Sequence, residues 1–113
     1  MSYEYLFLDE IDPVIPAMEA RGVSEVARSG RGFLTAYRRA GGDAERLSPT
    51  WRAKRDGFVR RHMAQVRKNK ERLWEDDPER KGKRPTRRHL ALIAWAYTPH
   101  PTRYFEYLAK LED

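Results

Sequence analysis

The sequence predicts an all-α fold, in which residues 1–113 form a single-domain irregular bundle of four to five helices around one long basic amphipathic helix. Three observations support this. A chain of 113 residues has the length of one domain and can bury a core without disulfide bonds or metal ions. Apolar residues recur at helical spacing after Pro49 and after Arg87. Proline, glycine and hydroxyl residues stand where helices should begin and end.

The composition excludes several classes of protein. The chain has no cysteine, which rules out disulfide scaffolds, thiol catalysis and cysteine-ligated metal centres. No apolar run approaches the ~20 residues of a membrane span, and no basic start precedes the N-terminal apolar stretch. We therefore expect no membrane association, no secretion and a cytoplasmic location.

The first twenty residues form an acidic, apolar N-terminal arm, with five acidic side chains and no lysine or arginine. Residues 3–8 alternate in a way that suits either a strand or a helix. Further along the arm, Pro16 suits the first turn of a short helix that runs to Arg21 and stops at Gly22.

Two short helices should follow. Ser24 and Glu25 open the first, which the segment 29–32 (Ser-Gly-Arg-Gly) should break. The second should cover 33–40 and close at Gly41 and Gly42. A helix-turn-helix is compatible with this stretch. The break also resembles an anion nest in chemical type, but it lacks the strand and the Lys-Ser/Thr ending of a phosphate-binding loop.

The best-marked element is the long helix, which begins at Ser48 and Pro49 and is predicted to run to about Trp74. One broad arc is apolar and should face the core; it contains Trp51, Phe58, Val59, Met63, Val66 and Leu73. Over 48–74 the chain has nine basic and two acidic residues. We expect a helix that is apolar inside and basic outside.

A loop of mixed charge, residues 75–86, should follow the long helix, because Asp77, Pro78 and Gly82 are turn formers. A buried helix should then cover 87–98, with apolar residues on most sides. Thr102 should cap a final helix whose apolar stripe faces inward.

The charge distribution points to a polyanionic partner, since the net charge is +6 and the pI near 9.8. We expect phosphate contacts with DNA or RNA, without evidence for base readout. The predicted contact residues are Lys54, Arg60, Arg61, Arg67, Lys68, Arg72, Lys81, Lys83, Arg84, Arg87 and Arg88. A solvated surface is the alternative for the helix, and ion pairs with acidic loop residues are the alternative for 80–88.

Other chemistry has weaker support. The histidines His62, His89 and His100 show no catalytic or metal-binding spacing, so packing and capping roles are expected for them, and no cofactor or metal. Trp74, beside the loop, is the best candidate for an exposed ring that stacks on bases. We also expect Arg52 and Arg55 to lie near the core and to pair with Asp9, Glu10 or Asp12 of the arm.

The sequence thus predicts a noncatalytic nucleic-acid-binding protein. The second interpretation is a protein-interaction module, in which the acidic arm and the basic helix bind complementary surfaces. A homodimer that joins the arm of one chain to the helix of another would satisfy it.

Overall fold

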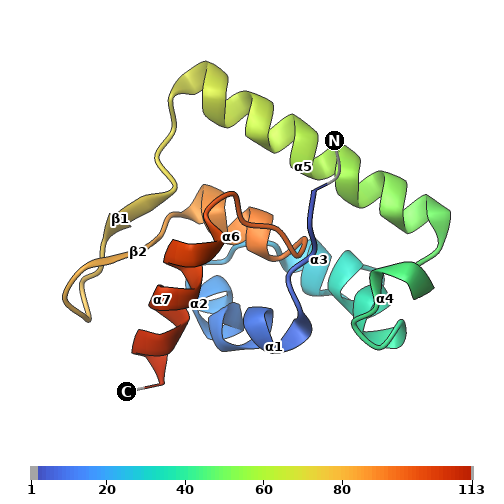
Figure 1. Ribbon diagram of the computed structural model, residues 1–113, viewed down its shortest axis with the longest axis horizontal. Coiled ribbons are helices and arrows are strands. Elements are labelled where there is room, and N and C mark those ends of the chain that lie inside the picture. Colours follow the sequence, from blue (N-terminus) through green and yellow to red (C-terminus); the bar gives the residue numbers. More distant parts are fainter. Residues whose placement is uncertain (1–2, 113) are drawn as a thin grey trace.

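The computed structural model describes residues 3–112, which form one mostly helical unit (Figure 1). Five helices have six or more residues within this range. In chain order the elements are α1 (Leu8–Ile11), η1 (Asp12–Val14), α2 (Ile15–Ala20), α3 (Glu25–Arg28), α4 (Phe33–Arg39), η2 (Ala44–Arg46), α5 (Pro49–Asn69), β1 (Trp74–Asp76), β2 (Lys83–Pro85), α6 (Arg87–Ile93) and α7 (Pro101–Leu111).

The prediction of a purely all-α protein is wrong, because the loop of residues 75–86 is mostly a β-hairpin. Strands β1 and β2 pair antiparallel, with Glu75 opposite Arg84 and Asp76 opposite Lys83. Opposite charges that face each other across the ladder stabilise a pairing that β-propensity alone does not indicate. At the turn, the Asp77 amide donates to the Gly82 carbonyl at 3.0 Å.

Glycines end the short N-terminal helices as predicted. Gly22, at φ +63°, follows α2, and Gly41 and Gly42, at φ +69° and +71°, follow α4. Residues 29–32 form a turn that separates α3 from α4. A Cβ atom at Gly32 would collide with the Val26 carbonyl oxygen, so this turn requires glycine.

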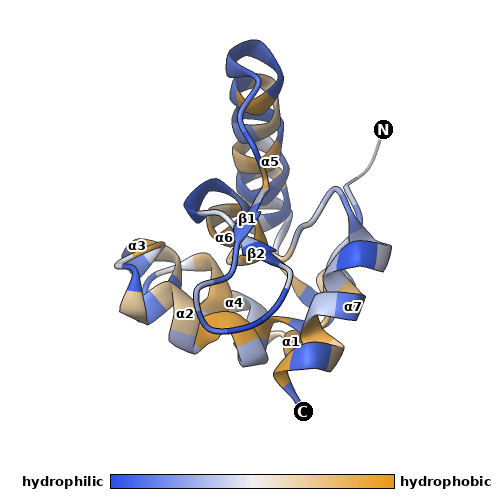
Figure 2. Cartoon of the chain, turned by 90° about the vertical axis from the view of Figure 1, so that its left-hand side faces the viewer, coloured by the Kyte–Doolittle hydropathy of each residue, from blue (hydrophilic) through white to orange (hydrophobic). Residues whose placement is uncertain are grey.

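The long helix α5 begins where the sequence predicts, because the Ser48 hydroxyl accepts the Trp51 amide at 3.2 Å and Pro49 occupies the first turn. It ends earlier than predicted, at Asn69, since Lys70 adopts a left-handed conformation at φ 52°. Its 21 residues span about 31 Å. Figure 2 shows the C-terminal end of α5 extending beyond the rest of the molecule.

The last two helices also differ from expectation. Thr86 caps α6 as predicted, by accepting the His89 amide, but α6 stops at Ile93 and a turn with Ala96 at φ 61° follows. Helix α7 begins at Pro101, so Thr102 lies inside the helix and does not cap it. Within the described residues, no helix combines the length and apolarity needed to cross a membrane.

The N-terminal arm packs onto the body instead of trailing from it. The Leu6 amide donates to the Ala96 carbonyl at 2.7 Å, and the Tyr37 hydroxyl donates to the Leu6 carbonyl at 2.8 Å. On the other side of the arm, the Tyr104 hydroxyl of α7 donates to the Glu10 carbonyl. These bonds join the arm to α4, α7 and the turn after α6.

Candidate nucleic-acid interface

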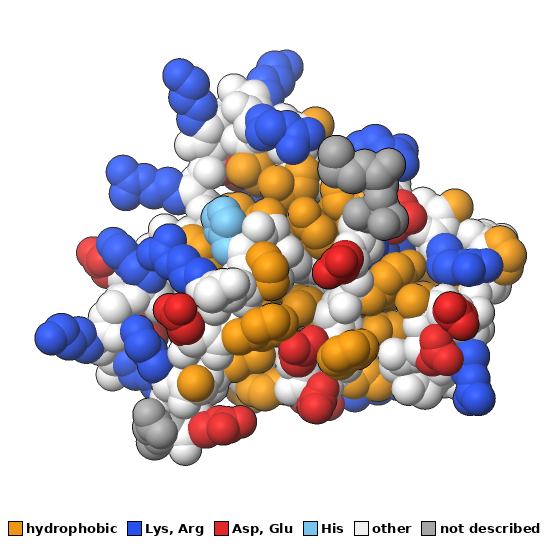
Figure 3. Space-filling view, viewed as in Figure 1, with side chains coloured by type: hydrophobic (Ala, Val, Ile, Leu, Met, Phe, Trp, Pro, Cys, Tyr) orange, Lys and Arg blue, Asp and Glu red, His pale blue; other side chains and the backbone are white. Residues whose placement is uncertain are grey.

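The predicted contact residues lie on three parts of the structure. Lys54, Arg60, Arg61, Arg67 and Lys68 lie on α5, and Arg72 follows it. Lys81, Lys83 and Arg84 belong to the hairpin, and Arg87 and Arg88 to the first turn of α6. Figure 3 shows Lys and Arg side chains along the upper edge, where α5 runs, with Asp and Glu mostly below them.

The five α5 cations, called here the cationic ridge, form two rows on the exposed side of the helix. At about 100° per residue, Lys54, Arg61 and Lys68 make one row, and Arg60 and Arg67 make a second row about 110° away. The strip between the two rows consists of Ala53, Gly57 and Ala64. Successive cations in a row are about 10 Å apart along the helix axis.

Every side chain of the ridge is exposed and has no ion-pair partner among the described residues. Within residues 3–112, none of the five lies within 4.0 Å of a carboxylate. The nearby acids are already used, because Asp56 pairs with Arg55 and Glu71 pairs with Arg88. The Lys54 ammonium lies 5.2 Å from the centre of the Trp51 ring, a cation–π contact that leaves the charge available to a ligand.

The hairpin cations, in contrast, are largely neutralised within the chain. The Lys83 ammonium bonds Asp76 at 2.5 Å, and this bond holds the pKa of the Asp76 carboxyl below its usual value. Arg84 bonds Glu75 at 2.7 Å, and Arg21 reaches the same carboxylate at 3.4 Å. The ion-pair alternative of the sequence analysis therefore describes these two residues.

The cations at the start of α6 also have internal partners. Two guanidinium nitrogens of Arg88 donate to Glu71 at 3.0 Å, and a third bonds His62 Nδ1 at 2.8 Å. Burial, and then the Arg88 charge, lower the pKa of His62. Arg87 donates to the backbone carbonyl of Arg21. The acid that pairs with Arg88 lies just beyond the end of α5, outside the loop where the sequence placed it.

Arg55 is completely buried and fastens the N-terminal arm to α5. The expectation that it pairs with Asp9, Glu10 or Asp12 is wrong, although the arm does pack beside α5. All five guanidinium N–H groups have acceptors, which are the backbone carbonyls of Tyr3, Glu4, Trp95 and Ala96 and the Asp56 carboxylate. Backbone carbonyls of the extended arm and of the turn after α6 accept hydrogen bonds from the guanidinium and so stabilise its charge. Residue types alone do not indicate this arrangement. Arg52 is exposed, which contradicts the expectation that it lies near the core.

Trp74 and His89 lie in the core, whereas His100 is exposed. Trp74 is 8% exposed and donates its indole N–H to His100 Nδ1 at 3.1 Å, so it is not the exposed ring that the sequence suggested. His89 is fully buried between the Leu73 carbonyl and the Thr98 hydroxyl, and burial lowers its pKa to about 4. In the described part of the chain, no group of three His, Asp or Glu side chains could hold a metal ion.

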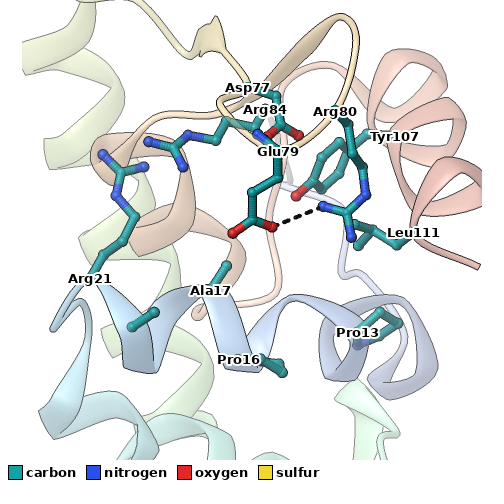
Figure 4. Close-up of a pocket in the computed structure, with 11 residues that line it drawn as sticks. Pro13, Pro16, Ala17, Arg21, Asp77, Glu79, Arg80, Arg84, Tyr107 and Leu111 are labelled. Atoms are coloured by element: carbon teal, nitrogen blue, oxygen red, sulfur yellow. Dashed lines mark hydrogen bonds and ion pairs between the residues drawn. The ribbon is translucent and has the colours of Figure 1, made fainter.

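One cavity that the sequence does not indicate lies between α2, the hairpin and α7. It has a volume of about 460 Å³, and Figure 4 shows Glu79 hanging into it toward Arg80, at 3.5 Å. Its lining includes three arginines, Arg21, Arg80 and Arg84, together with Asp77 and Glu79. Because acids and bases nearly balance here, the cavity does not extend the positive surface of α5.

Comparison of the chain with models of known protein families and with curated proteins finds no match.

Proposed function

We propose that this protein binds nucleic acid without catalysis, through phosphate contacts made by the cationic ridge of α5. The observation that carries the proposal is the contrast in pairing. Four of the five predicted contact residues on the hairpin and in the first turn of α6 bond to acceptors within the chain, whereas all five ridge cations are exposed and unpaired within residues 3–112. Cations that are free in the isolated protein release counterions when they meet phosphates.

The two-row arrangement favours duplex DNA. An α-helix of about 10–12 Å diameter fits the major groove of B-form DNA, which is about 12 Å wide. In that position the two rows would reach the phosphates on either side, with Ala53, Gly57 and Ala64 over the bases. These small side chains carry no hydrogen-bonding groups, so binding should depend little on sequence. The deep, narrow major groove of duplex RNA does not admit a helix.

The proposal treats α5 as the long basic amphipathic helix that the sequence analysis expects. Lys and Arg side chains provide charge and hydrogen-bond donors but no proton acceptor, which suits binding more than catalysis. A cytoplasmic location, as expected in the sequence analysis, is part of the same proposal.

Fluorescence anisotropy tests this function. We expect the protein to bind a labelled duplex DNA of mixed sequence at 50 mM salt, and to bind a second, unrelated duplex with an affinity within about threefold. Duplex RNA of the same length should bind more weakly. Absence of duplex DNA binding at 50 mM salt would refute the proposal.

A further inference from the structure

Three large apolar side chains are exposed among the described residues, and nucleic-acid binding explains none of them. They are Phe7, Val26 and Phe105, with exposed fractions of 64%, 78% and 43%. Val26 stands at the edge of a shallow pocket of about 470 Å³ that is lined by α3 and by the rings of Phe58 and Trp95. Exposed apolar surface beside a pocket is typical of a protein contact.

The aromatic rings at this pocket have no free faces to offer a base. The His62 ring stacks on Phe58 at 3.9 Å between centroids, and Trp95 stacks on Phe58 at 4.5 Å. Two rings cannot occupy one face, so both faces of Phe58 are covered. Trp95 is covered in the same way, by Phe58 and by Phe33 at 5.1 Å. The edges of these two rings therefore line the pocket. A ring edge favours contact with the face of an incoming aromatic side chain, in a T-shaped arrangement.

The charges beside the pocket favour an acidic partner. Lys54 lies one helical turn before Phe58 and Arg61 one turn after it, so both cations flank the pocket on α5. Neither cation has an ion-pair partner in the range 3–112. Glu25 is the single acidic side chain in the pocket lining. An apolar side chain with acidic neighbours would complement this surface.

The chain itself contains such a segment at Phe7. Residues 1–20 have five acids and no Lys or Arg, and Glu4 and Asp9 flank Phe7 with exposed side chains. The backbone at Phe7 is held in place, because its amide donates to Glu10 Oε1 at 2.8 Å. A side chain that is exposed on an ordered backbone loses little conformational entropy when it binds.

We propose that Phe7 of one copy of this protein inserts into the Phe58–Trp95–Val26 pocket of a second copy, with its acidic neighbours facing Lys54 and Arg61. The two surfaces share no residue, so the contact is heterologous and each chain can both donate a Phe7 and accept one. Lys54 and Arg61 also belong to the cationic ridge. Bound DNA and a second copy therefore compete for these two cations.

Analytical ultracentrifugation of the full chain tests the contact with variants that should fold. Phe7→Asp places a favourable capping residue before α1, and Val26→Asp places an acid in the first turn of α3, so neither change should unfold the protein. Phe105→Asp is the matched control, because it removes the third exposed apolar side chain from a different surface.

The wild-type chain and Phe105→Asp should show a mass that rises above 13.4 kDa as concentration increases to about 1 mM. Phe7→Asp and Val26→Asp should each associate at least about tenfold more weakly. An equal mixture of these two variants should form a two-chain species, because one retains the pocket and the other retains Phe7.

A monomeric wild type up to about 1 mM, or a mixture no more associated than either variant alone, would overturn the proposal. Its failure is distinguishable from failure of DNA binding, since Phe7 and Val26 lie outside the cationic ridge. At the low protein concentrations of the anisotropy assay, where self-association is negligible, both variants should bind duplex DNA as the wild type does.

Discussion

Removing one row of the ridge should change how DNA binding depends on salt. The perturbation is the triple substitution Lys54→Gln, Arg61→Gln and Lys68→Gln. Each residue is exposed and lacks an ion pair within the described range, and glutamine has nearly the helix propensity of lysine and arginine. Loss of binding would therefore reflect lost charge and not lost structure.

The magnitude follows from counterion release. For B-form DNA the logarithm of affinity falls with the logarithm of salt concentration by about 0.9 per neutralised phosphate. Five ridge contacts give a slope of about −4.5, and the two remaining cations of the triple variant give about −1.8. Between 50 and 200 mM salt the wild type should lose about 500-fold in affinity and the variant about tenfold. At 100 mM the variant should bind about 500-fold more weakly.

Fluorescence anisotropy over a salt series measures both slopes. The matched control is Arg31→Gln, Arg39→Gln and Lys110→Gln, which removes the same charge from exposed side chains outside α5. The control should keep a slope of about −4.5. Equal slopes for the wild type and the ridge variant, or an equal loss in the control, would refute the reasoning.

The remaining predictions concern stability, measured by urea unfolding. Arg55→Met should lower the free energy of unfolding by about 3–5 kcal/mol, because it leaves buried carbonyls of the arm and of the turn after α6 without a donor. Arg52→Met, at an exposed position, should change it by less than about 0.5 kcal/mol. Equal effects would contradict the structural role of buried Arg55. Gly32→Ala should lose about 2 kcal/mol or more, since its Cβ would collide with the Val26 and Ala27 carbonyls, and Gly30→Ala, which meets nothing within 4 Å, should be nearly neutral. The pKa of His89 is about 4 in the fold and about 6.5 when unfolded. The neutral ring therefore contributes about 3 kcal/mol to the free energy of unfolding above pH 6.5, and this contribution is lost as the pH falls toward 4. The pKa of His62 is also lowered, so His62 changes stability in the same direction. Stability that is flat between pH 6.5 and 4.5 would disprove this assignment.

Local signals in the sequence predicted where several helices begin or end. Ser48 and Pro49 cap α5, Thr86 caps α6, and glycines close α2 and α4, because each feature acts on the residues beside it. The end of α5 was not predictable in this way, since Lys70 adopts positive φ without being glycine. Thr102 had the chemistry of a cap, but Pro101 had already started α7.

Features that depend on distant residues escaped the sequence. The hairpin is stabilised by pairs such as Glu75 with Arg84. A count of charges does not show which residues pair, so the sequence indicated only a solvated loop. The pairing of Arg88 with Glu71 and the burial of Arg55 among carbonyls both require the chain to be folded. The ridge was easier to predict, because its residues lie on one helix and helical periodicity alone groups them.

Chemical-shift mapping of the ¹⁵N-labelled protein tests the central claim most directly, because it locates the bound DNA on the chain. On addition of a duplex DNA at low salt, we predict that the largest shifts fall on amides of α5, Pro49–Asn69, with little change over β1 and β2. Largest shifts on the hairpin, or none on α5, would contradict the account.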